Sequence, residues 1–320
     1  MSDLPKWGIV STVKAPLREI ADFAAYHLEL GAHRIILYLD DDVPETFEVL
    51  SAHPKLRVIK ADAANWRNAN RPDRHQPRQT ANARHALRRR SRDIDWLAHI
   101  DVDEFLWTNS PLDAQLDAMP EQCLTVRIRP VEALSSDGIS DIPAGHICFK
   151  AFARGRDTRE TQTAAIFPTF GTHLNGGFLS HVAGKVFFRT NNPDLRPRIH
   201  NVFLGDEKNP GQQELQETEL CHLHAPSLER WLARFDYRLE QGAYRSELAP
   251  TRSRARGGFT MHELFLTIIQ ENGRDGLIAF YNEVCRATPE LRARLEAHDL
   301  LRCYNLDLSA KREKHFPGLA

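Results

Sequence analysis

The chain has 320 residues, enough to bury a large core as one α/β domain or as one domain with an appendage. Its 42 Lys+Arg residues nearly balance its 43 Asp+Glu residues, so overall charge gives no general attraction to nucleic acid or to an anionic membrane. No apolar run has the length of a transmembrane segment, and the first residues, MSDLPKWGIV, lack a signal-peptide pattern. We therefore expect a cytoplasmic protein without a transmembrane segment, and peripheral contact with the inner face of the membrane stays open.

The cysteines are few and scattered. They are odd in number and include no CxxC pair, a pattern that predicts reduced, mostly buried thiols and neither a disulfide framework nor a zinc site. The five are Cys123, Cys148, Cys221, Cys285 and Cys303.

Short apolar, β-rich runs alternate with helical patterns in the first part of the chain. Runs of strand length occur at Trp7–Val13, Arg34–Leu39 and Leu56–Ala61. Apolar residues at helical spacing fill the gaps, and Gly31 follows the first helical pattern as a C-cap glycine does. The alternation predicts right-handed βαβ units around a parallel sheet.

The most informative stretch is Trp96–Trp107, WLAHIDVDEFLW, in which a buried strand leads directly into acidic residues. Asp101, Asp103 and Glu104 are placed between apolar blocks, where unpaired charge is costly to bury. Two carboxylates one residue apart at a strand end can share a hard divalent cation whose other ligands are water and phosphate oxygens. The stretch thus indicates a metal–diphosphate site, with capping aspartates of a turn as the plainer alternative.

Polar residues follow three of the predicted strands at their carboxyl ends. They lie at Thr12–Lys14, Asp40–Asp42 and Asp101–Asp103. In open α/β sheets ligands bind at this edge, so we expect the three groups to line one crevice.

An arginine-rich segment precedes the acidic strand. Arg71, Arg74 and Arg78 fall in or beside a polar loop near the predicted crevice, and guanidinium forks suit a diphosphate or an anionic acceptor. The later Arg88–Arg90 is expected to be a solvated helix face.

The second half of the chain is less regular. Pro130–Gly177 is a long irregular region with candidate strands at His146–Ala153 and Ala164–Phe170. A Pro/Arg/Gly-rich linker at Leu248–Gly258 is the best candidate boundary, and it divides the chain into 1–247 and a helical extension, 259–320.

Several segments together resemble a known family. "WGIVSTVK", "AYHLELGAHRIILYLDDD", "RQTANARHAL" and "DWLAHIDVDEFLW" occur in the order found in glycosyltransferase family 2. More narrowly, the chain resembles the branch with a DxDEF element, which is also similar to glycosyltransferase family 92. The likeness continues through "GKVFFRT", "RIHNVF" and "HLHAPSLERWLARF" and so covers roughly residues 7–240.

The resemblance implies a GT-A-like fold, a Rossmann-type, mostly parallel sheet flanked by helices, followed here by the C-terminal helical extension. It implies that Asp101 and Asp103 bind Mn²⁺ or Mg²⁺ on the diphosphate of a nucleotide-sugar. It also implies the residues of the nucleoside-binding edge and of the preceding helix, which are Thr12, Val13, Lys14, Asp40, Asp41, Gln79 and Asn82, and Arg78 is expected to contact the same ligand.

A histidine near the active site is also implied. His224 precedes the Ser227–Trp231 stretch as in the family, but that segment is shorter here than expected, so His222 is an equal candidate for the metal shell. The chain departs from the pattern again at "RIRPVEALSSDG", which lacks the family's tryptophan-and-glycine segment.

Attack at the anomeric carbon requires a carboxylate base opposite the leaving group. Glu132, Asp137 and Asp141 fall in the loop expected to cover that face, and Asp137 is preferred among them. Glu104 is the other candidate, with a structural hydrogen-bonding role as its alternative.

The sequence therefore predicts a metal-dependent, inverting glycosyltransferase (hexosyltransferase type). Its acceptor would be a hydroxyl of a glycan or lipid-linked molecule in cell-envelope or exopolysaccharide synthesis, without nucleic acid. Two rivals stay open: a sugar-nucleotide-fold protein that binds without turnover, and a DxD phosphohydrolase. The latter is disfavoured because Phe105 stands where its motif has Thr or Val.

Overall fold

The computed structural model describes residues 4–66, 70–251 and 254–319. The chain folds into two compact units, each assembled from separate segments. Unit 1 comprises Met1–Pro130, Ala183–Leu220 and Asp307–Ala320, and unit 2 comprises Val131–Val182 and Cys221–Leu306. The expected boundary at Leu248–Gly258 does not coincide with this division, and residues 252–253 of that linker lie outside the described residues.

Unit 1 contains the predicted parallel strands. They are β1 (Trp7–Val13), β2 (Arg34–Leu39), β3 (Leu56–Lys60) and β4 (Trp96–His99), in the order β3-β2-β1-β4. All seven residues of β1 are buried, because a central strand is covered on both faces, and this is why its sequence is mostly apolar.

Antiparallel strands extend this sheet beyond β4. Strand β8 (Lys185–Arg189) pairs with β4, and β6 (Thr125–Ala133) pairs with β8. Strand β12 (Gln213–His222) pairs with both β6 and β5 (Glu104–Thr108). The α/β fold is confirmed, but its sheet is mixed: β1–β4 pair in parallel, whereas β8 is antiparallel to both β4 and β6.

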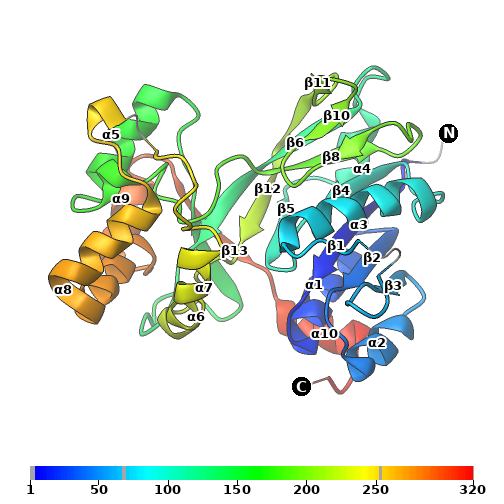
Figure 1. Ribbon diagram of the computed structural model, residues 1–320, viewed down its shortest axis with the longest axis horizontal. Helices are drawn as coiled ribbons and strands as arrows, with labels where there is room; N and C mark the ends of the chain where they lie inside the picture. The colour runs from blue at the N-terminus through cyan, green and yellow to red at the C-terminus, as the bar shows by residue number, and fades with distance from the viewer. Residues whose placement is uncertain (1–3, 67–69, 252–253, 320) are drawn as a thin grey trace. The chain divides into compact units, whose positions relative to one another are not determined.

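Helices cover the sheet of unit 1. Helix α3 (His75–Arg89) packs over β1 (Figure 1), and its Ala83, Ala86 and Leu87 are buried in the core with residues of β1, β2, β4 and β8. Small side chains on this face allow the helix to approach the sheet closely. The other helices of the unit are α1 (Leu17–Glu29), α2 (Pro44–Ser51), α4 (Leu112–Asp117) and α10 (Leu308–His315).

The last helix was not expected in this unit. Figure 1 shows α10 beside α1, so a late helix packs on an early one. Arg312 pairs with Asp22, and Lys314 Nζ lies 2.8 Å from Glu29 Oε2. The final residues therefore belong to the same unit as the first strand. A small three-stranded sheet, β9 (Arg196–Pro197), β10 (Val202–Leu204) and β11 (Glu207–Lys208), completes unit 1.

Unit 2 has a core of aromatic side chains. Trp231, Phe235, Phe265, Phe280 and Tyr281 are all buried in one cluster. They come from α6 (Leu228–Ala233), α7 (Phe235–Glu240) and α8 (Met261–Val284), and α8 begins with a capping box in which Thr260 and Glu263 hold each other's backbone N–H. The remaining helices are α5 (Arg156–Ile166), η1 (Gly171–His173), η2 (Arg254–Arg256) and α9 (Pro289–Glu296).

One expected strand of unit 2 is wrong. Residues Ala164–Ile166 form the end of α5, and the chain then turns into η1. The preceding Arg156–Thr163 contains neither Gly nor Pro, so the helix continues through Ala164–Ile166. These apolar residues were the reason for predicting a strand, and a short apolar run does not distinguish a strand from a helix.

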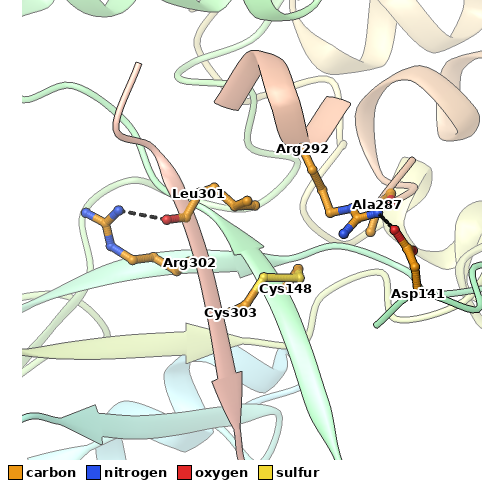
Figure 2. The surroundings of a disulfide bond; sticks show 7 residues. All are labelled: Asp141, Cys148, Ala287, Arg292, Leu301, Arg302 and Cys303. Atoms are coloured by element: carbon orange, nitrogen blue, oxygen red, sulfur yellow. Dashed lines mark hydrogen bonds and ion pairs between the residues drawn. A yellow bond between two sulfur atoms is a disulfide. The ribbon is translucent and has the colours of Figure 1, made fainter. Parts of the chain in front are cut away.

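The predicted reduced state of all cysteines is also wrong. Cys148 and Cys303 form a disulfide between β7 (His146–Lys150) and β13 (Leu301–Asn305), as Figure 2 shows. The two residues lie directly opposite each other in the antiparallel pair, although 155 positions separate them in sequence. Cys123, Cys221 and Cys285 are buried thiols, as expected.

Candidate active site

Helix α3 links the ends of three parallel strands in unit 1. Its Arg78 and Gln79 precede Asn82 by four and three positions, so each is a neighbour of Asn82 on the helix surface. Gln79 Nε2 donates to Asp101 Oδ1, just after β4, and Asn82 Nδ2 donates to Thr12 Oγ1 on β1 at 2.9 Å. Arg78 contacts Asp40, just after β2. The structure thus brings together residues that the sequence placed at separate strand ends.

Asp40 is the anchor of the arginine-rich segment. Its carboxylate accepts from Arg78 Nη2 at 2.6 Å and from Arg71 Nη2 at 2.9 Å, and His75 Nδ1 lies 3.2 Å away. The side chain is fully buried. Burial alone would raise the pKa of Asp40, but the hydrogen bonds and charges of His75 and Arg78 lower it to about 2. The ionised Asp40 therefore holds the segment before α3 in place.

Asp101 is paired with a lysine that the sequence analysis did not single out. Lys185 Nζ, on β8, lies 2.6 Å from Asp101 Oδ2 and 3.4 Å from Glu104 Oε2. The lysine side chain is completely buried, whereas that of Asp101 is 29% exposed. Burial would lower the pKa of Lys185, but the charges of Asp101 and Glu104 raise it, so the lysine stays cationic beside the two carboxylates.

The chain positions Lys185 through the glycine before it. Gly184 has φ +67°, and a Cβ there would overlap the carbonyl oxygen of Ile128 on the neighbouring β6. A charged residue between that glycine and the apolar Val186–Phe188 was the available signal in the sequence. Nothing in the sequence indicated that Lys185 pairs with Asp101, because the two residues lie 84 positions apart.

Two neutral histidines lie near Lys185. Burial and then the charge of Lys185 lower the pKa of both His99 and His200 to about 4. His200 Nδ1 is 3.0 Å from the carbonyl oxygen of Gly184, so the neutral ring donates to it. The site therefore combines one fixed cation with uncharged imidazoles at neutral pH.

The acid pair fits a hard divalent cation. Carboxylate oxygens are the ligands that Mg²⁺ and Mn²⁺ favour, and Asp101 and Asp103 are both partly exposed. Gln79 and Lys185 both donate to the carboxylate of Asp101 and so set its direction at the end of β4.

The remaining predicted residues of the strand ends differ in exposure. Val13 is buried, at 2% exposure. Lys14 Nζ lies 3.5 Å from Asp41 Oδ2, and both side chains are more than half exposed, so the pair adds little to stability but is accessible to a ligand.

Of the base candidates, Glu132 and Glu104 are buried. In unit 2, Glu132 accepts from the backbone N–H groups of Leu179 and Ser180 at 2.9 and 2.8 Å, and Lys150 Nζ is 3.2 Å away. Burial would raise the pKa of Glu132, but Lys150 and these donors lower it. Glu104, in unit 1, is also buried, and it accepts from the backbone N–H of Asp101 at 2.7 Å.

Asp137 is the exposed candidate. One of its carboxylate oxygens accepts from the backbone N–H of Leu228, the first residue of α6, at 2.9 Å. Asp141, also exposed, pairs with Arg292, a contact visible in Figure 2. A base must reach its substrate, so exposure favours Asp137 over Glu132 and Glu104.

The predicted histidines lie in unit 2. His224 Nε2 is 2.9 Å from the hydroxyl oxygen of Tyr244, which also accepts from Trp231 Nε1 at 3.1 Å. The ring of His222 lies between those of His224 and His181, with centroids 5.3 and 5.9 Å away. That one of them completes a metal shell with Asp101 and Asp103 stays a prediction.

Comparison with known proteins places this fold and site in a family. The model of glycosyltransferase family 92 matches residues 12–241. The chain therefore belongs to glycosyltransferase family 92. The narrower assignment to family 2 stays a prediction.

Other comparisons add less. A solved structure, the mannosyltransferase Ktr4p from S. cerevisiae, is similar at 12% identity and a TM-score of 0.24 over 41% of this chain and 40% of that chain. The alignment thus spans less than half of that protein. No curated protein matches the chain. Among the residues that the structure describes, no helix combines the length and apolar character that a membrane crossing requires.

Proposed function

We propose that this protein is a metal-dependent, inverting glycosyltransferase that moves a hexose from a nucleotide-sugar to a hydroxyl of a glycan or lipid-linked acceptor. Membership in glycosyltransferase family 92 supports the general activity. The observation that carries the proposal is the acid pair after β4, where Gln79 and Lys185 both donate to Asp101 and orient it. We assign the reaction to cell-envelope or exopolysaccharide synthesis on the cytoplasmic side.

Asp101 and Asp103 would hold the Mn²⁺ or Mg²⁺ ion, and His222 or His224 is proposed as a further ligand. When bound, the ion would supply positive charge against the diphosphate that leaves the sugar. Lys185 Nζ lies 2.6 Å from Asp101 Oδ2, and a neighbouring positive charge favours the deprotonated carboxylate that a metal ligand must be.

The nucleoside would bind along the ends of β1 and β2. Lys14 and Asp41 are exposed there, so their side chains can contact a ligand without breaking buried bonds. Asp40 and Arg78 already hold each other, and we assign them to shaping this edge. Asp137 is the proposed base, because its carboxylate is exposed, whereas Glu132 and Glu104 are buried and the exposed Asp141 is paired with Arg292.

The test is donor turnover with and without metal. Purified protein is incubated with nucleotide-sugars and Mn²⁺ or Mg²⁺, and both sugar transfer and slow donor hydrolysis are measured. Asp103→Ala should reduce turnover at least about a hundredfold, the scale for losing one charge-stabilising group in the transition state. Asp117→Ala is the matched control, because Asp117 is an exposed aspartate at the end of α4, away from the strand ends.

Two outcomes would contradict the proposal. Wild-type turnover in Asp103→Ala would remove the acid pair from the mechanism. A thermal shift with a nucleotide-sugar but no turnover under any metal would instead favour the rival, a protein that binds the donor without transferring the sugar.

A further inference from the structure

Four arginines form a cluster in unit 1 that the proposed reaction does not use. Arg84 and Arg88 lie one turn apart on α3, and Arg196 and Arg198 lie in and just after β9, the strand that packs against α3. We call these four residues the arginine cluster. Burial and then the charges of Arg198, Arg196 and Arg88 lower the pKa of Arg84, so Arg84 lies close enough to each of the other three to be repelled by it.

No acid neutralises this cluster. Within the described part of the chain, none of the four guanidinium groups forms an ion pair with a carboxylate. Other arginines of the unit are paired, for example Arg34 and Arg57, which lie 2.8 and 2.9 Å from the carboxylate of Asp93. Like charges held together without a counter-ion cost free energy, so a compensating gain elsewhere is expected.

The guanidinium groups are oriented by neutral acceptors. Arg88 Nε donates to the carbonyl oxygen of Pro193 at 3.4 Å, and Arg196 donates to that of Gly205. These bonds fix direction without cancelling charge. Arg84 is half-buried, and no described residue accepts a hydrogen bond from its buried Nε. A buried donor left without a partner costs about 1–3 kcal/mol, so this nitrogen favours an acceptor brought by a ligand.

We propose that the arginine cluster binds a phosphate group. A phosphate offers several oxygens and up to two charges, which matches converging guanidinium forks better than a single carboxylate does. The phosphate could belong to a lipid headgroup or to a soluble phosphate or diphosphate compound. The cluster shares no residue with the proposed donor site, so the inference can be tested independently of the proposed function.

The test measures binding of the full-length protein to two probes. One is a vesicle of phosphatidylcholine mixed with phosphatidylglycerol, with pure phosphatidylcholine as the reference, read by co-sedimentation. The other is inorganic pyrophosphate, read by calorimetry. Removing two charges with Arg84→Gln/Arg198→Gln should lower vesicle partitioning roughly 25-fold, since each basic residue at an anionic surface contributes about five-fold. Pyrophosphate affinity should fall by a similar factor.

The matched control is Arg89→Gln/Arg92→Gln. It removes the same charge from exposed positions at the end of α3 and just beyond it, outside the cluster. Its binding should stay near that of the wild type if the cluster is a shaped site. Binding to vesicles alone would identify a lipid headgroup, and binding to pyrophosphate alone would identify a soluble phosphate. The inference is overturned if the wild type binds neither probe, or if the control pair loses as much binding as the cluster pair.

Discussion

Lys185 Nζ and Asp101 Oδ2 lie 2.6 Å apart, and they join the antiparallel β8 to the end of the parallel β4. The lysine is inaccessible to solvent, whereas the aspartate reaches the surface. A completely buried cation thus forms an ion pair with a partly exposed carboxylate. The same ammonium group lies 3.4 Å from Glu104, which also accepts a hydrogen bond from the backbone N–H of Asp101. These residues form one electrostatic unit that fixes the turn carrying the acid pair.

Replacing Lys185 with methionine should therefore destabilise the fold. The substitution keeps the length of the side chain but leaves the buried Glu104 and the adjacent Asp101 without their cation, a loss of about 3 kcal/mol on the scale of broken buried ion pairs. Urea unfolding of the two proteins would measure the difference. Adding Glu104→Gln to Lys185→Met should recover part of it, since one uncompensated charge is then removed. An unchanged unfolding midpoint in Lys185→Met would contradict this account of the site.

The ion pairs of Asp40 should make stability depend on pH in the acid range. The pKa of Asp40 falls from 3.8 to about 2 in the folded protein, so its contribution is complete above pH 3.8 and is lost as pH falls toward 2. The shift corresponds to about 2 kcal/mol. Asp40→Asn removes the titrating group, so the free-energy gap between wild type and variant should narrow as the pH is lowered through this window. A gap that stays constant with pH would show that Asp40 acts without its charge.

His27 should act in a different pH window. The ring is fully buried, with Nδ1 2.8 Å from the carbonyl oxygen of Phe23 and Nε2 3.2 Å from the backbone nitrogen of Leu106. One nitrogen donates and the other accepts, so only the neutral ring satisfies both bonds. Burial lowers the pKa of His27 from 6.5 to about 3.

The folded state thus resists a proton that the unfolded state binds. The contribution of the neutral His27 to stability is complete above pH 6.5 and is lost as pH falls from there toward 3. At about pH 5 the loss should be roughly 2 kcal/mol. His27→Gln retains a donor and an acceptor without titrating, so its unfolding free energy should change less between pH 7 and pH 5 than that of the wild type. Equal pH dependence of the two proteins would assign the effect to another group.

The sequence predicted the part of the site that depends on local pattern. Strand ends follow from apolar runs, and the face of α3 that carries Gln79 and Asn82 follows from helical spacing. The role of Lys185 was not predicted, because its partner lies across an antiparallel strand pair. The sequence gives no register for strands that are joined by long connections. The packing of α10 against α1 was not predicted either, because nothing local in Leu308–His315 specifies the first helix as its neighbour.

The disulfide of unit 2 gives the last prediction. Cys148 and Cys303 tie β13 to β7, and the bond closes a long loop, so removing it should lower the unfolding free energy by about 2–4 kcal/mol. Mass spectrometry under non-reducing, denaturing conditions should find three alkylatable thiols, those of Cys123, Cys221 and Cys285. Cys148→Ser/Cys303→Ser should show the lower stability with or without a dithiol reductant, whereas the wild type should reach the same value only when reduced. Five alkylatable thiols in protein purified without reductant would show that the bond does not form.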